Sequence, residues 1–311
     1  MTEEIQHYVK CPLCSSKDYF IKYHFSKNRY NHNYFITHSW DGGHNVELTI
    51  VKCMNCNFVY QNPIFKDEFL NSLYPETIIP TELTNKDFTR NYDFLYSLIF
   101  KHQSKKKNLI SIDIGTRYGQ LPNFLKTKSY TSIGIEMNNA CVLAAKKYGI
   151  NDIYCGKIGD IKTILNSYQA DTIDLITMID VIEHLTDINE DFKIISSLQK
   201  KDQLLCFTTM FNDSIGGFLF GKEWYYIHAQ HTLYFSKKTI KLFLKKYDYE
   251  LIEYFHVPLH KSFLHVFKEF FKLIKHKLQI WFHKDENNKK WFAENRPHCL
   301  DLITVIAKKI K

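Results

Sequence analysis

One short apolar run followed by a glycine constrains the fold of this chain more than any other feature. The run Leu109–Ile114 has lysines on one side and Gly115 on the other, and a helix-like segment follows. A second apolar run ends at Glu136, and a third covers Asp174–Ile179. Short buried strands that alternate with helices are typical of a parallel sheet covered on both faces. The sequence therefore predicts an α/β fold with a doubly wound, mostly parallel sheet.

The sequence spacing from Gly115 to Glu136 indicates a nucleotide-binding unit. In a strand–glycine turn–helix unit, backbone N–H groups and the helix N-terminus face a bound nucleotide. Glu136 lies 21 positions after Gly115, where an acidic side chain accepts hydrogen bonds from the ribose of an adenosine. A nicotinamide dehydrogenase is disfavoured, because the G-x-G-x-x-G positions here read Gly115, Arg117 and Gln120.

Two Cys-x-x-Cys pairs precede this region, Cys11 with Cys14 and Cys53 with Cys56. Thiolates at this spacing reach one ion from a tight turn, and two such turns complete a tetrahedral zinc site. The 38 residues between the pairs exceed the usual ribbon spacing, but aromatic alternation and a turn at Asp41–Gly43 predict a hairpin that brings the pairs together. Four sulfur ligands leave no open position, so the zinc is expected to be structural. The alternative is two unrelated pairs of buried or redox cysteines.

Composition narrows the class of protein. The chain has 311 residues, 45% of them hydrophobic, which suits one full-sized domain with a small appendage. The start of the chain is acidic and polar, and no long apolar run is present. Four of the eight cysteines form two tight pairs and four are isolated, which suits a reducing compartment, so we expect a cytoplasmic protein. The formal charge of +8 is local, because residues 259–311 hold 12 Lys and Arg against 5 Asp and Glu. Charge alone does not choose between an acidic substrate, a membrane surface and nucleic acid.

Several motifs, taken in order, resemble one family. Asp113-Ile-Gly115, Glu136 and the run DLITMIDVIEHL resemble the class I S-adenosylmethionine-dependent methyltransferases, in the branch that includes the ubiquinone-type and sugar methyltransferases. The segment FGKEWYYIHAQHTLYFSKKTIKLFLKKYDYELIE looks like a later part of that branch, and VKCMNCNFVYQNP is similar to the zinc-binding leader of some members. The similarity runs from about Leu109 to the C-terminus. It implies a Rossmann-like methyltransferase fold with S-adenosylmethionine as cofactor.

The resemblance also assigns cofactor contacts. The chain departs from the family at Arg117, which replaces the usual middle glycine. If that position needs a positive φ, an arginine costs free energy and crowds the cofactor. The remaining positions match, so the methionine portion is expected to contact Asp113, Gly115 and Gly119, the ribose Glu136, and the adenine Met137, Ile158 and Asp160.

Candidate catalytic side chains follow the third strand, at the edge of the sheet where such folds bind ligands. His184 is a candidate base or acceptor-orienting group, and His231 in the later YYIHAQH segment is another. The alternative for both histidines is a packing or capping role. Helical spacing places Asp180 on one face with Glu183 and His184. Resemblance to ubiquinone-type members implies a divalent ion, such as Mg²⁺, at this cluster.

Changes in composition divide the chain into three parts. We expect a zinc-ribbon-like module at 1–65, a connector with a leading helix at 66–105, and a methyltransferase domain at 106–311. The last part contains a basic insertion at about 260–296, whose apolar residues recur at helical spacing. Such a helix covers a core or forms a dimer contact, or else lies on an anionic membrane or attracts a phosphorylated substrate.

The expected function is S-adenosylmethionine-dependent O-methylation of a small polar acceptor, such as a sugar, nucleotide-sugar or glycan precursor. The acceptor preference comes from the resemblance alone. Two alternatives stay open: methylation of a lipid or quinone at the membrane surface, and a non-catalytic, partner-binding relative with an altered cofactor pocket. Nucleic acid is disfavoured as a partner, because the residues between the cysteine pairs lack dense Lys/Arg clusters. Peripheral membrane contact and the oligomeric state stay open.

Overall fold

The computed structural model describes residues 5–26, 46–72, 92–104, 106, 108–224, 226–256 and 301–311. Its contacts divide the chain into two compact units, each made of three segments. The turn expected at Asp41–Gly43, much of the connector and the basic helix at 260–296 lie outside the described residues. The first unit comprises Met1–Tyr74, Met210–Ser236 and Phe255–Ile303, and the second comprises Pro75–Thr209, Lys237–Tyr254 and Thr304–Lys311.

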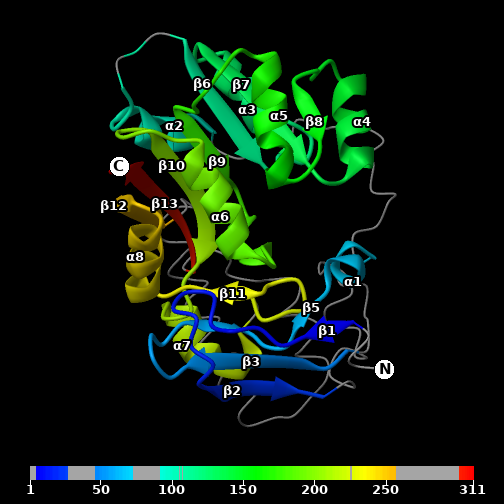
Figure 1. The fold of residues 1–311 in the computed structure, drawn as a ribbon, viewed down its shortest axis with the longest axis vertical. Helices are drawn as coiled ribbons and strands as arrows, with labels where there is room; N and C mark the ends of the chain where they lie inside the picture. Colours follow the sequence, from blue (N-terminus) through cyan, green and yellow to red (C-terminus); the bar gives the residue numbers. More distant parts are fainter. Residues whose placement is uncertain are drawn as a thin grey trace, which may run out of the picture. The chain divides into compact units, whose positions relative to one another are not determined.

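A seven-stranded sheet forms the second unit, with strand order β12-β13-β10-β9-β6-β7-β8. From β6 the chain steps outward through β7 to β8 and then returns to the other side of β6, which is the doubly wound order. The pairs β6–β7, β7–β8, β6–β9 and β9–β10 are parallel, which confirms the predicted fold (Figure 1). The strands are β6 (Leu109–Ile114), β7 (Tyr130–Glu136), β8 (Ile153–Cys155), β9 (Leu175–Met178), β10 (Leu204–Met210), β12 (Tyr249–His256) and β13 (Leu302–Lys309).

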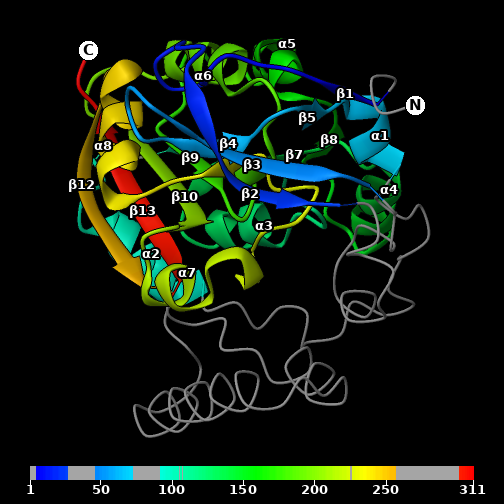
Figure 2. The same ribbon diagram turned by 90° about the horizontal axis from the view of Figure 1, so that it is seen from below.

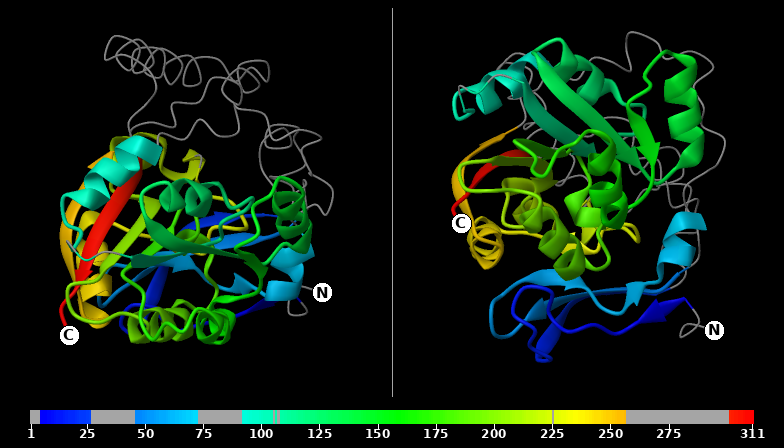
Figure 3. Two further views of the ribbon diagram at one scale, coloured as in Figure 1. Left: turned by 90° about the horizontal axis from the view of Figure 1, so that it is seen from above. Right: turned by 45° about the horizontal axis from the view of Figure 1, so that its top comes forward.

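The last strand, β13, is the exception to the parallel arrangement. Lys309 near its end donates its N–H to the carbonyl of Gln203 at 2.9 Å, just before the start of β10. At the other end, the N–H of Phe211 donates to the carbonyl of Asp301 at 3.2 Å. The two strands therefore run in opposite directions, and the red arrow of β13 lies between β12 and β10 (Figure 3).

Helices cover both faces of this sheet. α5 and α6 lie on one side of it, and α2 and α3 on the other (Figures 2 and 3). In α6 the Asp187 side chain caps the N-terminus by accepting from the N–H of Glu190, and Ile188, Phe192 and Ile195 form its buried stripe. No helix in the described ranges has the length and apolarity needed to cross a membrane. The helices are α2 (Tyr92–Phe100), α3 (Gln120–Lys126), α4 (Asn139–Lys147), α5 (Ile161–Ser167), α6 (Ile188–Ser197) and α8 (Lys237–Lys246), with 3-10 turns η2 (Ile158–Asp160) and η3 (Ile182–His184).

The first unit contains a four-stranded sheet in the order β11-β4-β3-β2 (Figure 2). β2 and β3 pair antiparallel, with Tyr19 opposite Cys53, so the predicted pairing of the residues between the cysteine pairs is confirmed. A small pair, β1-β5, accompanies the sheet. The elements are β1 (Gln6–His7), β2 (Tyr19–Phe25), β3 (Leu48–Cys53), β4 (Val59–Gln61), β5 (Ile64–Phe65), α1 (Asp67–Ser72), α7 (Ile215–Phe220), η4 (Gly221–Glu223) and β11 (Leu233–Tyr234).

A segment far along the chain completes this sheet. β11 pairs antiparallel with β4, and the N–H of Gln61 donates to the carbonyl of Thr232 at 2.8 Å. The core of the unit combines Leu48, Ile50 and Val59 with Trp224 and Tyr234. The first unit thus includes Met210–Ser236, whereas we expected this segment within the contiguous 106–311 domain. The domain boundaries themselves stay a prediction.

Candidate functional site

The predicted cofactor residues of the second unit lie at the carboxyl ends of neighbouring strands. Asp113 is near the end of β6, and Glu136 is the last residue of β7. Glu136 lies opposite Cys155, the last residue of β8, and the carboxyl end of β8 precedes η2. Carboxyl ends of parallel strands meet at one edge of a sheet, which is where such folds bind ligands. The sequence motifs therefore converge on one edge of the sheet.

Gly115 occupies a position that admits no side chain. Its φ of +70° is in the left-handed region. A Cβ atom there would lie 2.4 Å from Cγ2 of Val181, which follows β9. Both the backbone conformation and this close approach require glycine. The turn after β6 is thereby held against the chain that leaves β9.

Arg117, which replaces the family's usual middle glycine, has a φ of +56°. This position therefore does have the positive φ at which an arginine costs free energy. A residue with a Cβ costs about 1–2 kcal/mol in the left-handed region. The Arg117 guanidinium lies 5.1 Å from the ring centroid of Tyr118. Burial raises the pKa of the Tyr118 phenol, and the positive charge of Arg117 opposes that rise. The arginine side chain is thus engaged with its neighbour in the turn.

Glu136 joins the turns that follow β6 and β7. Its Oε2 accepts from the N–H of Arg117 at 2.9 Å, and its Oε1 accepts from the N–H of Asn138 at 2.9 Å. A carboxylate offers about four acceptor positions. These two backbone contacts orient Glu136 at the edge of the sheet and leave it the capacity to accept from a diol.

Asp113 and its surroundings are buried. The hydroxyl of Thr177 donates to Asp113 Oδ1 at 2.6 Å. Burial, followed by the charge of Asp113, raises the pKa of the Cys206 thiol to about 12. Nearby, Oγ1 of Thr116 is buried without a hydrogen-bond partner among the described residues. Thr116 lies inside the glycine turn and was not among the residues predicted from the sequence.

The three predicted adenine contacts follow β7 and β8. Met137 is 52% exposed and Ile158 is buried. Asp160 Oδ2 accepts from the N–H of Lys157 at 2.8 Å, which closes the η2 turn. Asp160 therefore has a local structural contact in addition to its proposed role.

The expected helical face of Asp180, Glu183 and His184 is wrong. Only the short 3-10 turn η3 forms there, and Asp180 precedes it with a φ of +58°. The hydroxyl of Thr208 donates to Asp180 Oδ1 at 2.6 Å and accepts from the N–H of Asp180 at 2.7 Å. Bonding to β10 turns Asp180 away from helical geometry, so the spacing argument for three ligands on one face fails. Glu183 is 1% exposed, and His184 is half-buried.

His231 belongs to the first unit and is buried. Its Nδ1 lies 2.8 Å from the carbonyl oxygen of Tyr226. Because a carbonyl only accepts, Nδ1 carries the proton and Nε2 is the basic nitrogen of the neutral ring. The ring of His228 lies 3.6 Å away, centroid to centroid. This geometry fixes the tautomer that general-base chemistry at Nε2 requires.

The two cysteine pairs of the first unit have the same local backbone. The carbonyl of Cys11 accepts from the N–H of Ser15 at 2.8 Å, and that of Cys53 accepts from Asn57 at 3.1 Å. Ser15 and Asn57 both have positive φ, at 61° and 64°. The amides of Cys11 and Cys53 donate in turn to carbonyls five residues ahead. Each pair therefore closes the tight turn that presents two thiols to one point.

The four cysteine sulfurs meet. Sγ of Cys11 lies 3.5 Å from that of Cys56, Cys14 and Cys53 are equally close, and all four lie within 4.8 Å of one another. Sulfurs arranged tetrahedrally at about 2.3 Å from zinc are about 3.8 Å apart. Burial raises the pKa of the Cys56 thiol to about 11, whereas at Cys14 burial is outweighed by the Ser16 N–H and other donors, which lower its pKa to about 7. The donor set and spacing fit a closed zinc site.

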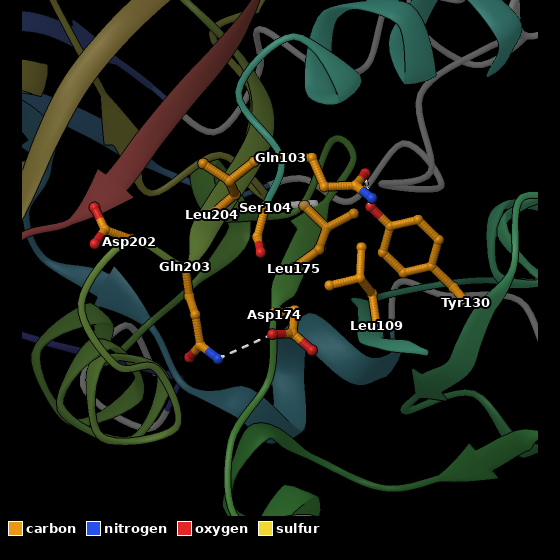
Figure 4. A pocket seen from close by; sticks show the side chains of 9 residues that line it. All are labelled: Gln103, Ser104, Leu109, Tyr130, Asp174, Leu175, Asp202, Gln203 and Leu204. Carbon is orange, nitrogen blue, oxygen red and sulfur yellow. Dashed lines mark hydrogen bonds between the residues drawn. The ribbon is translucent and has the colours of Figure 1, made fainter. Parts of the chain in front are cut away.

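A pocket lies at the other edge of the second unit's sheet (Figure 4). It adjoins the starts of strands β6, β7, β9 and β10. Gln203 Nε2 donates to Asp174 Oδ1 at 3.3 Å, and Asp174 Oδ2 accepts from the N–H of Ile110 at 2.9 Å. These contacts join strand starts, so this pocket is distinct from the predicted cofactor edge. Its lining residues are Gln103, Ser104, Leu109, Tyr130, Asp174, Leu175, Asp202, Gln203 and Leu204.

Comparison with known proteins found a matching family model and similar solved structures. Similar solved structures include magnesium protoporphyrin IX methyltransferase from Synechocystis PCC 6803 with bound SAH, at 11% identity over 74% of this chain and 88% of that chain, with a TM-score of 0.45. Another is a SAM-dependent methyltransferase from Methanosarcina mazei, at 13% identity, 69% and 98% coverage and a TM-score of 0.46. No curated protein matches the sequence significantly. The methyltransferase domain family matches residues 87–254, more than half of the chain. The chain therefore belongs to the methyltransferase domain family, and it is an S-adenosylmethionine-dependent methyltransferase.

Proposed function

We propose that this enzyme transfers the methyl group of S-adenosylmethionine to an oxygen of a small polar acceptor, namely a sugar, nucleotide-sugar or glycan precursor. The observation that carries the cofactor half of the proposal is Glu136, whose carboxylate is oriented by two backbone N–H groups at the end of β7. The acceptor half is supported by the resemblance of the later segments to the sugar methyltransferase branch.

The residues at this edge suit the parts of the cofactor. Glu136 accepts from the ribose hydroxyls, and Asp113, Gly115 and Gly119 line the methionine portion. Met137 and Ile158 flank the adenine, and Asp160 accepts from its amino group. The bound cofactor supplies an electrophilic methyl group on a sulfonium. The task of the chain is then to orient the acceptor and exclude water.

The proposed catalytic side chains are His231, His184 and Asp180. His231 is best suited to take the acceptor proton, because its Nδ1–H is held by the Tyr226 carbonyl and Nε2 is the basic nitrogen. His184 orients the acceptor. Asp180, tied to Thr208, acts by holding the chain that leads to His184. A divalent ion at Asp180, Glu183 and His184 stays an untested prediction; an activity that survives chelation with intact zinc content rejects it.

The cysteine cluster of the first unit is proposed to bind one structural zinc ion. Its support is the matched turn geometry of the two pairs and the mutual approach of four sulfurs. A four-sulfur site has no open position for a substrate. Metal analysis of the purified protein tests this directly: one zinc per chain is expected, and a folded, metal-free protein with four reactive thiols rejects it.

Calorimetry and a transfer assay test the proposed reaction separately. SAH should bind the full-length protein with measurable heat, and Glu136→Ala should weaken that binding, with Glu250→Ala on the exposed side of β12 as the control. Methyl transfer from labelled S-adenosylmethionine should then be measured to a panel of UDP-, dTDP- and GDP-sugars. Absence of SAH binding rejects the cofactor site. Binding without transfer to any member of the panel rejects the acceptor class.

A further inference from the structure

Gln61, the last residue of β4, has a buried side chain that the fold itself does not use. It is 0% exposed, and neither Oε1 nor Nε2 has a hydrogen-bond partner among the described residues. Its backbone, by contrast, is paired, with the N–H donating to the Thr232 carbonyl. An unpaired buried polar group costs about 1–3 kcal/mol. Burying both ends of an amide without partners therefore weakens the first unit.

A second buried glutamine shows how the same side chain looks when it serves the fold. Gln199, in the second unit, donates from Nε2 to the carbonyls of Ile173 at 3.1 Å and Leu204 at 2.8 Å. Its Oε1 accepts from the hydroxyl of Tyr249 at 2.7 Å. Gln199 is thus satisfied at both ends of its amide by protein groups. Gln61 offers the same donors and acceptor and has no partner among the described residues, so its amide is able to serve a bound ligand.

The face of the sheet on which Gln61 lies indicates which side chains would surround a ligand bound to its amide. Gln61 is directly opposite Ile50 in the β3–β4 register, and opposite residues project to the same face. Ile50 belongs to the core cluster that contains Trp224, Tyr226 and Tyr234. The Gln61 amide therefore projects to the aromatic face of the sheet.

Polar residues adjoin Gln61 along the chain that enters β11. Gln230, His231 and Thr232 are 3%, 6% and 1% exposed, and the Thr232 carbonyl is the acceptor for the Gln61 N–H. A mostly apolar, aromatic environment with a few buried polar groups is the usual make-up of a small-molecule site. The proposed base, His231, is one of these groups.

We propose that Gln61 is an acceptor-binding residue that recognises two neighbouring hydroxyls of a sugar. Oε1 accepts from one hydroxyl, and Nε2 donates to the oxygen of the next, which is the donor and acceptor pairing that a planar amide provides. The aromatic face suits the apolar C–H side of a sugar ring. This inference rests on the proposed carbohydrate acceptor and adds a specificity-determining residue from the first unit.

Two matched substitutions test the inference through stability. Gln61→Leu keeps the size of the side chain and removes an unpaired amide, so the midpoint of thermal unfolding should rise by about 2 °C or more. Gln199→Leu leaves two carbonyls and a phenol unpaired, so its midpoint should fall by about 5 °C or more. A fall in both variants means that Gln61 serves the fold, and it overturns the inference.

A transfer assay supplies the second readout. With the nucleotide-sugar that the wild type methylates best, Gln61→Leu should raise the acceptor KM about tenfold or more while the affinity for SAH stays unchanged. An acceptor KM within twofold of the wild type overturns the inference even if stability rises. A wild type that binds SAH but methylates no sugar of the panel instead rejects the proposed acceptor class, and the sugar contact of Gln61 with it.

Discussion

The two units of this enzyme are built in different ways. The second unit consists largely of consecutive strand–helix units, in which β6, α3, β7, α4 and β8 follow one another in sequence and in space. The first unit joins a short N-terminal sheet to β11, which lies more than 170 residues further along the chain. Its cysteine turns meet at one point. Local contacts thus organise the second unit, whereas long-range pairing and the cysteine cluster organise the first.

Both units contain buried polar groups, and not all of these groups are paired. In the second unit, Lys309 Nζ is buried yet donates to Ser196 Oγ at 2.6 Å and to the Tyr247 carbonyl at 2.9 Å. In the first, Gln61 and the hydroxyl of Tyr60 are buried without partners among the described residues. A scaffold satisfies its buried polar groups, whereas a binding surface leaves some for its ligand. In the second unit, Thr116 Oγ1 also lacks a partner among the described residues, and it lies in the turn of the proposed cofactor site. Each unit therefore combines satisfied buried groups with unpaired groups near a proposed site.

Loss of one cysteine ligand should give the largest difference between the two units, because it should destabilise only the first. Cys53→Ser removes a fully buried ligand of the proposed zinc site, and structural zinc contributes on the order of 10 kcal/mol. We expect loss of the metal and of hydrogen-exchange protection in β3 and β4. The control is Cys155→Ser, an exposed thiol outside the cluster. Full protection of β3 and β4 in metal-free Cys53→Ser contradicts the dependence of the first unit on zinc.

A core truncation probes the packing of the second unit. Phe192 is 0% exposed, and its ring lies 4.5 Å from that of Phe243, centroid to centroid. Phe192→Ala should lower the free energy of unfolding by about 3–5 kcal/mol, measured by urea denaturation. Leu143→Ala, at a half-exposed position of α4, should change it by less than about 0.5 kcal/mol. A similar loss in both variants would show that α6 does not anchor the core.

Removing one charge should affect binding more than folding. Glu136→Gln keeps the shape of the side chain but replaces one acceptor oxygen by a donor. We expect the Kd for S-adenosylmethionine to rise about 10- to 100-fold, or about 1.4–2.7 kcal/mol, by calorimetry. Glu250→Gln, on an exposed residue of β12, is the matched control. An unchanged Kd for Glu136→Gln removes this residue from the cofactor site.

Backbone strain gives a smaller effect. Arg117→Gly should stabilise the second unit by about 1 kcal/mol, because glycine adopts positive φ without a Cβ clash. Asn108 has a similar φ of +57°, but asparagine tolerates this region, so Asn108→Gly should gain less. Urea denaturation of both variants gives the comparison. Equal changes would mean that Arg117 is not strained in the protein.

The smallest effect concerns pH. The hydrogen bond from Lys126 lowers the pKa of Asp152 below its ordinary value of 3.8, and the Tyr168 hydroxyl adds to this. A lowered folded-state pKa stabilises the protein above the unfolded-state value, and the contribution is lost as pH falls through the folded-state pKa. Because Asp152 is 41% exposed, we expect less than about 1 kcal/mol. Asp152→Asn should flatten the unfolding profile between pH 5 and 3 by about this amount, whereas the exposed Asp171→Asn should not.

Much of the cofactor edge was predictable because each of its sequence motifs lies within one short segment. An apolar run, a glycine with positive φ and an acidic residue one unit later needed only the order of strands to bring them together. Asp180 was mispredicted for the opposite reason. The spacing of Asp180, Glu183 and His184 reads as a helix, but a hydrogen bond to Thr208 on a neighbouring strand overrides that local pattern. Spacing within a segment does not reveal a partner 28 residues away.

Local patterns in the sequence were enough to predict the α/β class, the glycine turn with Glu136, and the four cysteines proposed to share one ion. Each of these depends on residues whose chemistry or periodicity acts within one short segment. Contacts between distant segments show that β11 completes the N-terminal sheet, and that Gln61 is buried without a partner among the described residues while Gln199 is fully bonded. These outcomes depend on contacts between distant segments, and no single segment encodes which buried polar group will find a partner.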